Sequence, residues 1–556
     1  MIARLLICVL LLIAAPAVAV VDQFVVIFLD DDRSRAMAGY SVAAGVDSIT
    51  GALPLTPSLD AIALAGFAHA NIKTSAVCSP SRARLLDYGP VGNPQNPYGR
   101  TVVPEDPDTT VQVELGFHNF AREAKADGWN TAFFGKWHIS NYKFLNDGVT
   151  AVKQAGFDEA QAVLVGNPTN EIPGIDYDDS ATIGDVWADC QGHKFFPYTD
   201  IDGTITWTHT HSSKVIFDAV DTYMTAAAAT GSGKYLIFVE TSAPHIPQET
   251  GEGGAVECNG NTETQNDYPP GESFDAGETK NDVYLANIEY IDTRMGTLIT
   301  DHILSDNGYT DHMVVSLTDN GTQGSISLMA ECDASPGKKN TPYICGTTSH
   351  FVAAGPGIIA NEHLTNRLNS IDDIPATLLS LMGSKSTTPW GLDFSDCMTQ
   401  ENSQSAASCR HTRDSVTWAE WKELGGSDGT LTRPPRLTDA NGVWTNYEVA
   451  SEVWLEGGAH VILHRIYDPS NSMNFVKESL YPVDDGEDGG ALGGMYSTED
   501  TVWDVVAGGE IAEDGTDWDI TATDAAKAAL VRAHRDLDHQ WDRDGAPTPT
   551  LGGGSF

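Results

Sequence analysis

The sequence predicts an α/β fold, with a large mixed, mostly parallel sheet sandwiched by helices. Four short apolar runs each stop at polar residues, which is typical of strands buried on both faces of a parallel sheet. Segments with helical spacing separate them, and this alternation indicates an α/β protein. The runs are FVVIFLDDD at 24–32, TAFFGKWH at 131–138, YLIFVETSAPHIP at 235–247 and HMVVSLTDNG at 312–321.

Two of the helices that separate these runs can be placed by their spacing. Residues 120–125 are predicted to form a helix that ends at Gly128, because glycine is favoured just after a helix. A second helix is predicted because five apolar residues fall on one helical face. These are Leu285, Ile288, Ile291, Met295 and Leu298.

The length of 556 residues is enough for one large domain and a smaller one. A stretch rich in Ser, Thr and Asp at about 384–410 indicates the boundary. Beyond it, VWLEGGAHVILHRIY at 453–467 predicts strands around a turn, and DAAKAALVRAHRDLDHQW at 524–541 predicts a helix. We therefore expect four parts: a signal peptide at 1–19, a main domain at 20–400, a smaller α+β subdomain at 401–545 and a flexible tail at 546–556.

The first 19 residues have the pattern of a secretory signal peptide. Arg4 supplies the positive charge, residues 5–15 the short apolar run, and Ala17-Val18-Ala19 the cleavage site. The apolar run is too short to span a bilayer, and no later stretch is long enough. We expect a secreted or periplasmic protein with no membrane span in the mature chain, in an oxidising compartment.

The chain is strongly acidic. It has 77 Asp and Glu residues against 32 Lys and Arg residues, which gives a net charge of −45. Nucleic acid is therefore not expected as a partner. Against this background, a cluster of basic residues becomes informative.

Seven of the eight cysteines remain after the expected removal of Cys8 with the signal peptide, and seven is an odd number. Six of them could form three disulfides, and we expect the pairs Cys190–Cys258, Cys332–Cys345 and Cys397–Cys409, although other pairings are possible. Cys78 is left over. It is either a buried thiol or a residue with special chemistry.

Oxygen-bearing side chains follow the first and the fourth apolar run. Asp30 and Asp31 end the first, and Asp319 and Asn320 end the fourth. Each pair alone would be compatible with a solvated turn. Because ligands of open α/β sheets bind beyond the carboxyl ends of the strands, the two pairs together predict a site for a hard cation, Ca²⁺ or Mg²⁺. Asp32 makes a pair shifted by one residue possible, but Asp30 and Asp31 fit the strand length better.

Basic side chains follow the second and the third apolar run, and another lies just beyond the fourth. Each one alone would be compatible with a surface position, but in so acidic a chain the set predicts an anion pocket. Its members are Lys136, His138, His245 and Lys339. Ser79-Pro80 predicts a helix start next to Cys78, whose N–H groups favour an anion. Arg82, one turn later, can offer a planar fork to sulfate or phosphate.

CSPSRARLL at 78–86 resembles the Cys-x-Pro-Ser-Arg signature of the formylglycine-dependent sulfatases, which belong to the alkaline phosphatase superfamily. Further motifs resemble the same family in the same order, between residues 24 and 383. They are VVIFLDD, FGKWH, APHIP, LTDNG and DIPATLLSLMG. The resemblance implies an alkaline phosphatase-like fold and a sulfuric ester hydrolase that acts on a sulfated carbohydrate or aryl sulfate.

The resemblance also implies a modified Cys78. In this family a separate formylglycine-generating enzyme oxidises the cysteine to Cα-formylglycine. The hydrated aldehyde has two hydroxyls on one carbon, so that one can attack sulfur and the other can then lose its proton and expel sulfate. A serine ester would instead need a separate hydrolysis.

Roles for the other residues follow from the same resemblance. The cation, preferably Ca²⁺, would be held by Asp30, Asp31, Asp319 and Asn320. The sulfate would be held by Arg82, Lys136, His245 and Lys339. His138 would assist the elimination, and His245 and Lys339 could protonate the leaving oxygen.

The sequence departs from the family pattern at two places. Asp87-Tyr88-Gly89 stands where the family commonly has Thr-Gly after the second Leu of the signature, and Ile344 and Thr348 stand where it often has Glu and Arg. Two alternatives stay open: a phosphonate or phosphate-diester hydrolase with the same site, and a non-catalytic sulfoglycan-binding relative. Substrate choice is expected to depend on residues 160–215 and 249–280.

Overall fold

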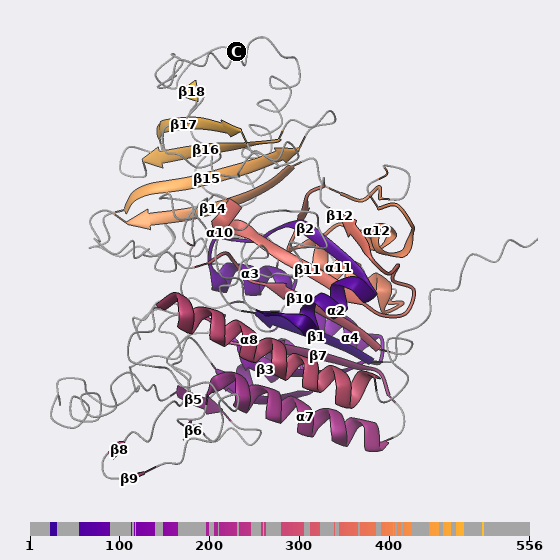
Figure 1. Cartoon of the computed structure of the whole chain (residues 1–556). Coiled ribbons are helices and arrows are strands. Elements are labelled where there is room, and N and C mark those ends of the chain that lie inside the picture. The colour runs from indigo at the N-terminus through magenta and orange to yellow at the C-terminus, as the bar shows by residue number, and fades with distance from the viewer. Residues whose placement is uncertain are drawn as a thin grey trace, which may run out of the picture.

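The computed structural model describes mainly residues 55–88, 118–139, 148–164, 211–230, 233–245, 280–304, 312–322, 344–364, 367–384 and 391–403. It also describes the backbone of the remaining strands named below and a few short stretches. Figure 1 shows the whole chain, with a large sheet flanked by helices and a second sheet built from the C-terminal part.

Four neighbouring parallel strands form the centre of the large sheet, in the order β10-β1-β7-β3. They are β1 (Gln23–Leu29), β3 (Asn130–Lys136), β7 (Tyr235–Glu240) and β10 (His312–Thr318). These are the four predicted runs, and the prediction is confirmed. All residues of β7 and β10 are buried, because helices cover both faces of the sheet.

The described part of the large sheet has 11 strands, in the order β12-β2-β11-β10-β1-β7-β3-β4-β5-β6, and β13 pairs with β2. The pairings of β11 with β10 and with β2 are antiparallel, as are those of β5 with β4 and β6, so the sheet is mixed. The outer strands are β2 (Phe67–Lys73), β4 (Glu159–Leu164), β5 (Phe196–Thr199), β6 (Ile205–Thr208), β11 (Thr348–Ala354), β12 (Glu362–Leu364) and β13 (Asn369–Ser370).

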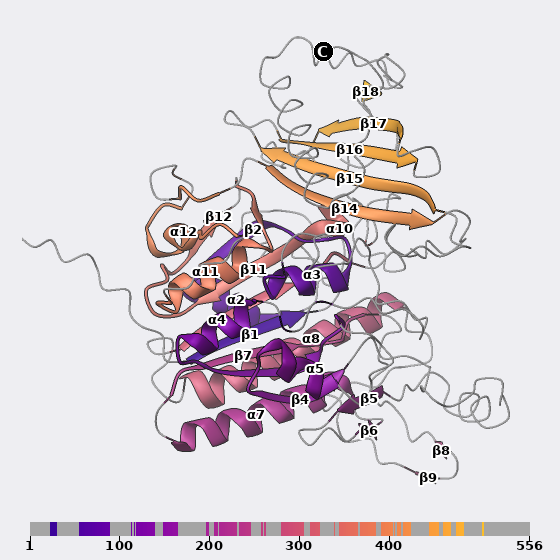
Figure 2. The ribbon, with the colours of Figure 1, turned by 180° about the vertical axis from the view of Figure 1, so that it is seen from behind.

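The helices form two layers, one on each face of the sheet. On the face toward the viewer in Figure 1, α2 (Pro57–Ala65), α7 (Ser212–Thr230) and α8 (Lys280–Leu298) pack into one core cluster. Figure 2 shows the opposite face, which is covered by α3 (Cys78–Leu85), α4 (Phe120–Ala126), α5 (Gly148–Ala155), α11 (Asp373–Leu381) and α12 (Ser395–Thr399). The α/β fold with a mixed, mostly parallel sheet is thus confirmed.

Both helices predicted from spacing are present. In α4, Asn119 accepts a hydrogen bond from the N–H of Arg122, which caps the helix start, and Gly128 follows its end with a φ of 85°. In α8, four of the five predicted apolar residues are buried and Leu285 is partly buried. The helix continues as a π-helical turn, η3 (Ile299–Leu304), and a short helix α10 (Ile344–Thr347) leads into β11.

The C-terminal sheet has five described strands, all antiparallel, in the order β14-β15-β16-β17-β18. They are β14 (Ser415–Glu423), β15 (Trp444–Trp454), β16 (His460–Asp468), β17 (Asn474–Pro482) and β18 (Trp503–Asp504). The predicted pair of strands around a turn corresponds to β15 and β16. A two-stranded ribbon of β8 (Glu257–Cys258) and β9 (Asn261–Thr262) completes the strands. The predicted helix at 524–541, the signal peptide and the tail lie outside the described residues.

One of the three expected disulfides can be checked. Cys397 and Cys409 are bonded, as predicted, and the bond ties α12 to the start of the C-terminal part. Cys78 keeps its thiol. The side chains of the other four cysteines lie outside the described residues. A search of the described helices finds none that is both long and apolar enough to cross a membrane.

Candidate active site

Cys78 is the first residue of α3, and it is only 2% exposed. Val77 precedes it in an extended conformation, with a φ of −156°, so the chain enters the helix directly from the segment after β2. The helix begins two residues earlier than the Ser79-Pro80 pair predicted. Pro80 is accepted in the first turn because the N–H that it lacks would have no partner inside the helix.

Lys339 contacts Cys78 directly. Its Nζ donates a hydrogen bond to Cys78 Sγ over 3.1 Å, across 261 positions of sequence. Two backbone hydrogen bonds hold this region. The N–H of Lys339 donates to the carbonyl of Thr322 over 3.0 Å, and the N–H of Gly321 donates to the carbonyl of Gly346 over 2.9 Å. The chain therefore returns to the end of β10, and Lys339 places a cation beside the residue expected to become the nucleophile.

Arg82 lies one turn into α3 and is 1% exposed. Its Nε donates to Asp319 Oδ2 over 3.0 Å, its Nη1 donates to the carbonyl of Lys136 over 2.8 Å, and the same Nη1 forms an ion pair with Glu240. The resemblance implies that Arg82 holds the sulfate. The structure shows its guanidinium bonded at the ends of three of the four central strands, β3, β7 and β10, which fixes its orientation.

Glu240 was not singled out from the sequence. It is the last residue of β7 and is 1% exposed, and its carboxylate is stabilised by Arg82. A buried carboxylate needs such a partner, since an unpaired charge is costly away from water. The signal available in the sequence is a Glu that directly ends an apolar run, as the acidic pairs end the first run and the fourth.

Asp319 and Asn320 follow β10, and both are fully buried. In the register of the sheet, Leu29 at the end of β1 is paired with Thr318, so the segments that follow these two strands start at the same edge. Asp30 and Asp31 themselves lie outside the described residues. Among the residues that the structure describes, no three or more His, Cys, Asp or Glu side chains cluster in a way that suits a metal. The carboxylate and amide oxygens of Asp319 and Asn320 fit a hard cation.

The glycine of the GKWH segment lies where two strands approach each other closely. Gly135 has a φ of 97°, and a Cβ there would lie 1.9 Å from the carbonyl oxygen of Glu240 on β7. Only glycine allows this close approach of the strands. The pairing with β4 shifts here, and the fully buried Lys136 follows. His138 has a φ of 53°, which is uncommon for a residue with a side chain and is often found at functional sites.

His245 is half-buried and follows β7 after a turn in which its N–H donates to the carbonyl of Ser242 over 3.1 Å. The Ala243–Pro244 peptide bond in this turn is cis. Because β3 and β7 are parallel neighbours, His138 and His245 leave the sheet at the same edge. Hydrogen bonds thus join Cys78 to Lys339 and Arg82 to Asp319, and the sheet brings the ends of β3 and β7 to the same edge.

Two of the departures from the family pattern, Asp87 and Thr348, occupy buried positions. Asp87 is 1% exposed, and burial, with Asp372 and Glu123 nearby, raises its pKa to about 8. Thr348 begins β11 and is paired in register with Lys73 of β2, whose Nζ donates to Thr348 Oγ1 over 2.8 Å. A buried cation therefore contacts this position from the neighbouring strand. The side chain of Ile344 lies outside the described residues.

Several solved structures of bacterial proteins share this fold. The PsFucS1 sulfatase from Pseudoalteromonas sp. has a TM-score of 0.56 at 15% identity, with 96% of this chain and 92% of that chain covered. A structure on glycosaminoglycan metabolism by Bacteroides thetaiotaomicron has a TM-score of 0.59 at 15% identity, with 95% and 97% covered. A protein in complex with its substrate D-glucosamine-2-N,6-O-disulfate has a TM-score of 0.55 at 11% identity, with 96% and 100% covered.

Among the curated proteins, none matches the sequence. The family described as sulfatase matches residues 23–384, which include the central strands, α3 and α11. This match covers more than half of the chain, and the chain shares its fold with the solved PsFucS1 sulfatase. The chain therefore belongs to the sulfatase family and is a sulfuric ester hydrolase.

Proposed function

We propose that the protein hydrolyses sulfate esters of carbohydrates or aryl alcohols with a formylglycine made from Cys78 and a divalent cation, preferably Ca²⁺. The observation that carries the proposal is the Lys339 ammonium bonded to Cys78 Sγ at the start of a helix. A cation and helix N–H groups beside one residue form a site for an anionic group. Arg82 and Asp319 link this site to the edge where the cation would bind.

Asp319 and Asn320, with Asp30 and Asp31, would hold the cation. When bound, it would offset negative charge on the sulfate oxygens. Arg82 keeps the Asp319 carboxylate in a fixed orientation from the side of α3, so that this ligand does not have to reorganise when the cation enters. Lys136 and Lys339 would bind the sulfate by charge.

The proposal also assigns the residues that move protons during the reaction. The proposed aldehyde, when hydrated, supplies one hydroxyl to attack sulfur and a second whose deprotonation expels sulfate. Lys339 and His245 would donate a proton to the leaving oxygen of the alcohol, and His138 would accept the proton of the second hydroxyl. The short distance from Lys339 Nζ to Cys78 Sγ supports the first of these roles.

Sulfated sugars are the substrates that the comparisons favour. One similar structure contains its substrate D-glucosamine-2-N,6-O-disulfate, and another contains k-i-k-neocarrahexaose. The segments 160–215 and 249–280, which we expect to choose among such sugars, lie largely outside the described residues.

Maturation and export belong to the same proposal. A formylglycine-generating enzyme would convert Cys78, whose thiol is not used in a disulfide. The pattern of residues 1–19 supports secretion or a periplasmic location, and the Cys397–Cys409 disulfide is consistent with an oxidising compartment.

The test is to produce the protein together with the maturation enzyme and to assay sulfated sugars and aryl sulfates. We expect an aldehyde in the peptide that carries residue 78, turnover of at least one sulfate ester, and no activity in Cys78→Ala. Full activity of Cys78→Ala would refute the formylglycine role. Phosphate diesters and phosphonates, tested at saturating Ca²⁺, should be poorer substrates. A clear preference for them would support the alternative hydrolase, and no turnover of any ester would support a binding protein.

A further inference from the structure

A second buried arginine lies on α3, the helix that begins with Cys78. Arg84 is 3% exposed and forms a two-fold contact with Asp372, the residue just before α11. Its Nε donates to Asp372 Oδ1 over 2.9 Å and its Nη2 donates to Oδ2 over 2.7 Å. Two parallel bonds between a planar guanidinium and a carboxylate fix the relative orientation of the two groups as well as their distance.

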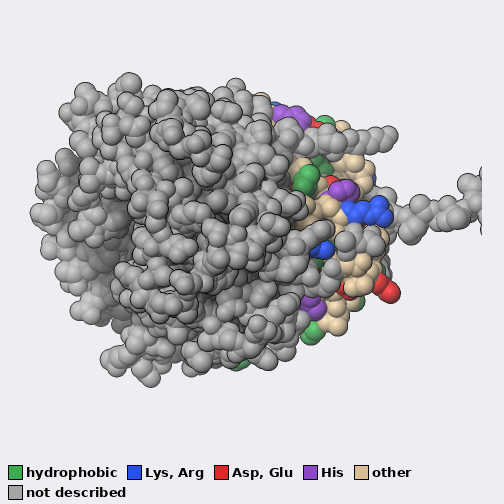
Figure 3. Space-filling model, turned by 90° about the horizontal axis from the view of Figure 1, so that it is seen from above, with side chains coloured by type: hydrophobic (Ala, Val, Ile, Leu, Met, Phe, Trp, Pro, Cys, Tyr) green, Lys and Arg blue, Asp and Glu red, His purple; other side chains and the backbone are tan. Residues whose placement is uncertain are grey.

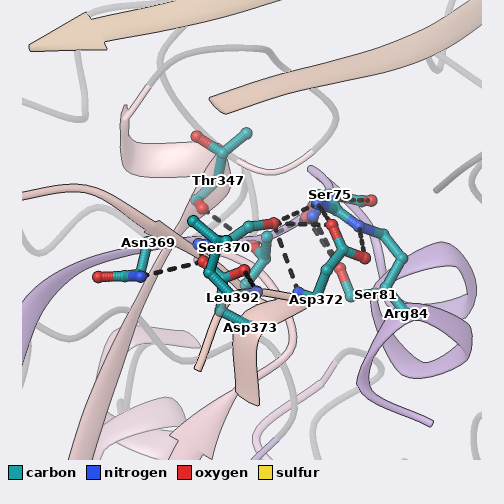
Figure 4. A network of polar contacts seen from close by, with 10 residues as sticks. Ser75, Ser81, Arg84, Thr347, Asn369, Ser370, Asp372, Asp373 and Leu392 are labelled. Carbon is teal, nitrogen blue, oxygen red and sulfur yellow. Dashed lines mark hydrogen bonds and ion pairs between the residues drawn. The ribbon is translucent and has the colours of Figure 1, made fainter. Parts of the chain in front are cut away.

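The rest of the guanidinium contacts two serines. Nη1 donates to Ser75 Oγ over 3.1 Å, and Nη2 donates to Ser370 Oγ over 2.6 Å. Ser370 belongs to β13, while Ser75 lies three residues before Cys78. Figure 4 shows Arg84 between Ser75, Ser370 and Asp372. One side chain thus connects the segment that leads into Cys78 with β13 and the start of α11.

The segment before Cys78 is held by further bonds. The N–H of Ser75 donates to Ser81 Oγ over 3.0 Å, and Ser81 Oγ donates to the carbonyl of Ser75 over 3.2 Å. The N–H of Thr74 donates to the carbonyl of Thr347 over 2.7 Å. Any rotation of α3 that moved Arg84 away from Asp372 would therefore also strain the path of the chain into residue 78.

Arg82 and Arg84 hold α3 from two different directions. Residues two apart on a helix do not share a face. Arg82 is bonded to Asp319 and Glu240 at the strand ends, whereas Arg84 is bonded to Asp372. A helix tied at one face can still rotate about its axis. A helix tied in two directions cannot, and the direction of the side chain at residue 78 is fixed with it.

We propose that Arg84 and Asp372 are positioning residues that fix the rotation of α3 and thereby orient residue 78 toward the sulfate. This inference rests on the proposed role of Cys78. The positioning role differs from a contribution to stability. Apolar residues can often replace a buried ion pair without loss of stability, but the geometry that the ion pair imposed is then lost. Misplacement of a reacting group by about 1 Å can cost about 100-fold in rate.

The main test separates stability from rate. Arg84→Met and Asp372→Leu alone should lower the melting temperature, because each leaves a buried charge without its partner. The double variant R84M/D372L should recover most of that loss. Its kcat should nevertheless stay ~10–100-fold below that of the wild type, with KM changed by less than about threefold. Arg84→Lys, which keeps the charge but not the two-fold contact, should also have a low kcat.

A second readout needs no catalysis. In protein made without the maturation enzyme, residue 78 is a thiol that is 2% exposed. Alkylation of that thiol, followed on the peptide that carries it, should be several-fold faster in R84M/D372L than in the wild type. The control is Val220→Ala in α7, a buried position on the opposite face of the sheet. It should lower the melting temperature but leave kcat and the alkylation rate unchanged.

The outcomes are distinct. If R84M/D372L has the kcat and the alkylation rate of the wild type, the positioning role is refuted. If the double variant stays unstable, it is compared with a control variant of the same melting temperature. The positioning role is then refuted if the two variants have equal kcat values and equal alkylation rates. If Cys78→Ala is fully active, the proposed function fails, and the alkylation rate still decides whether the pair orients residue 78.

Discussion

Arg82 is shared by two buried carboxylates. It is bonded to Asp319, a proposed cation ligand, and to Glu240, which ends the neighbouring strand β7. The two carboxylates share one guanidinium, so Glu240 draws part of the positive charge of Arg82 away from Asp319. A second carboxylate close to a proposed ligand also favours the binding of a divalent cation.

Glu240→Gln should therefore weaken cation binding. We expect the dissociation constant for Ca²⁺ to rise by about 3–10-fold, because one nearby negative charge is lost and Arg82 then acts on Asp319 alone. Titration calorimetry on the folded protein measures this without any assay of activity. Asp218→Asn, which makes the same charge change on α7, is the control and should leave the constant nearly unchanged. An unaltered Ca²⁺ affinity in Glu240→Gln would show that Glu240 does not act on the cation site.

At the scale of elements, the end of α3 carries an unusual residue. Asp87 has a φ of 65°, and the helix closes with bonds from the N–H of Tyr88 to the carbonyl of Ala83 and from the N–H of Asp87 to that of Arg84, both 2.9 Å. This closure usually has glycine at the position of Asp87. Both carboxyl oxygens of Asp87 are buried and have no hydrogen-bond partner among the described residues.

The raised pKa of Asp87 gives a pH-dependent stability. Folding raises the pKa from 3.8 to about 8, so the folded protein retains a proton that the unfolded chain releases. Below pH 4 the Asp87 carboxyl group is protonated in both the folded and the unfolded protein, so its burial causes no pH-dependent loss of stability. Between about pH 4 and pH 8 the unfolded state is increasingly favoured, and above pH 8 the penalty stays constant.

Asp87→Asn should remove this pH-dependent loss of stability, because an amide does not ionise. The turn should be kept, since asparagine also tolerates a positive φ. We expect the variant to melt at the same temperature as the wild type near pH 4. Near pH 8 it should be more stable, by on the order of 2 kcal/mol. Thermal unfolding from pH 4 to pH 8.5 measures the difference. The exposed Asp301, changed to Asn, serves as the control, and its effect should not grow with pH. A difference that stays constant with pH would contradict the buried, protonated state of Asp87.

At the scale of the whole molecule, the net charge of −45 is the dominant feature. On the face shown in Figure 3, the coloured side chains of the described part mix hydrophobic, acidic, basic and His residues and form no patch of a single kind. An excess of 45 negative charges in one chain causes electrostatic self-repulsion. Such repulsion opposes the compact state and is screened by salt.

Added salt should therefore stabilise the protein. The melting temperature should rise when NaCl is increased from about 10 mM to about 300 mM, because the screening length falls from about 30 Å to below 8 Å. The rise should flatten beyond that range. Melting curves across a NaCl series, recorded at saturating Ca²⁺, measure it. A rise that appears only above about 1 M would instead indicate a general effect of salt on apolar surface.

The sequence alone was sufficient for the centre of the fold. The four apolar runs became β1, β3, β7 and β10, because strands buried on both faces must be continuous apolar segments. The same physical rule placed Asp319 and Asn320 at a strand end. The short separation between Cys397 and Cys409 made their disulfide predictable. These features depend on neighbours in the sequence, which a pattern records.

The tertiary structure decided the partners. Lys339 with Cys78, Arg82 with Glu240 and Arg84 with Asp372 are separated by 261, 158 and 288 positions. Periodicity indicates that a residue is buried, but it does not indicate which distant side chain neutralises its charge. Glu240 and Asp372 were missed for this reason. The sequence by itself determined the centre of the sheet and the signature around Cys78. Only the tertiary packing around α3 decided how residue 78 is held, because buried charges are paired across space and not along the chain.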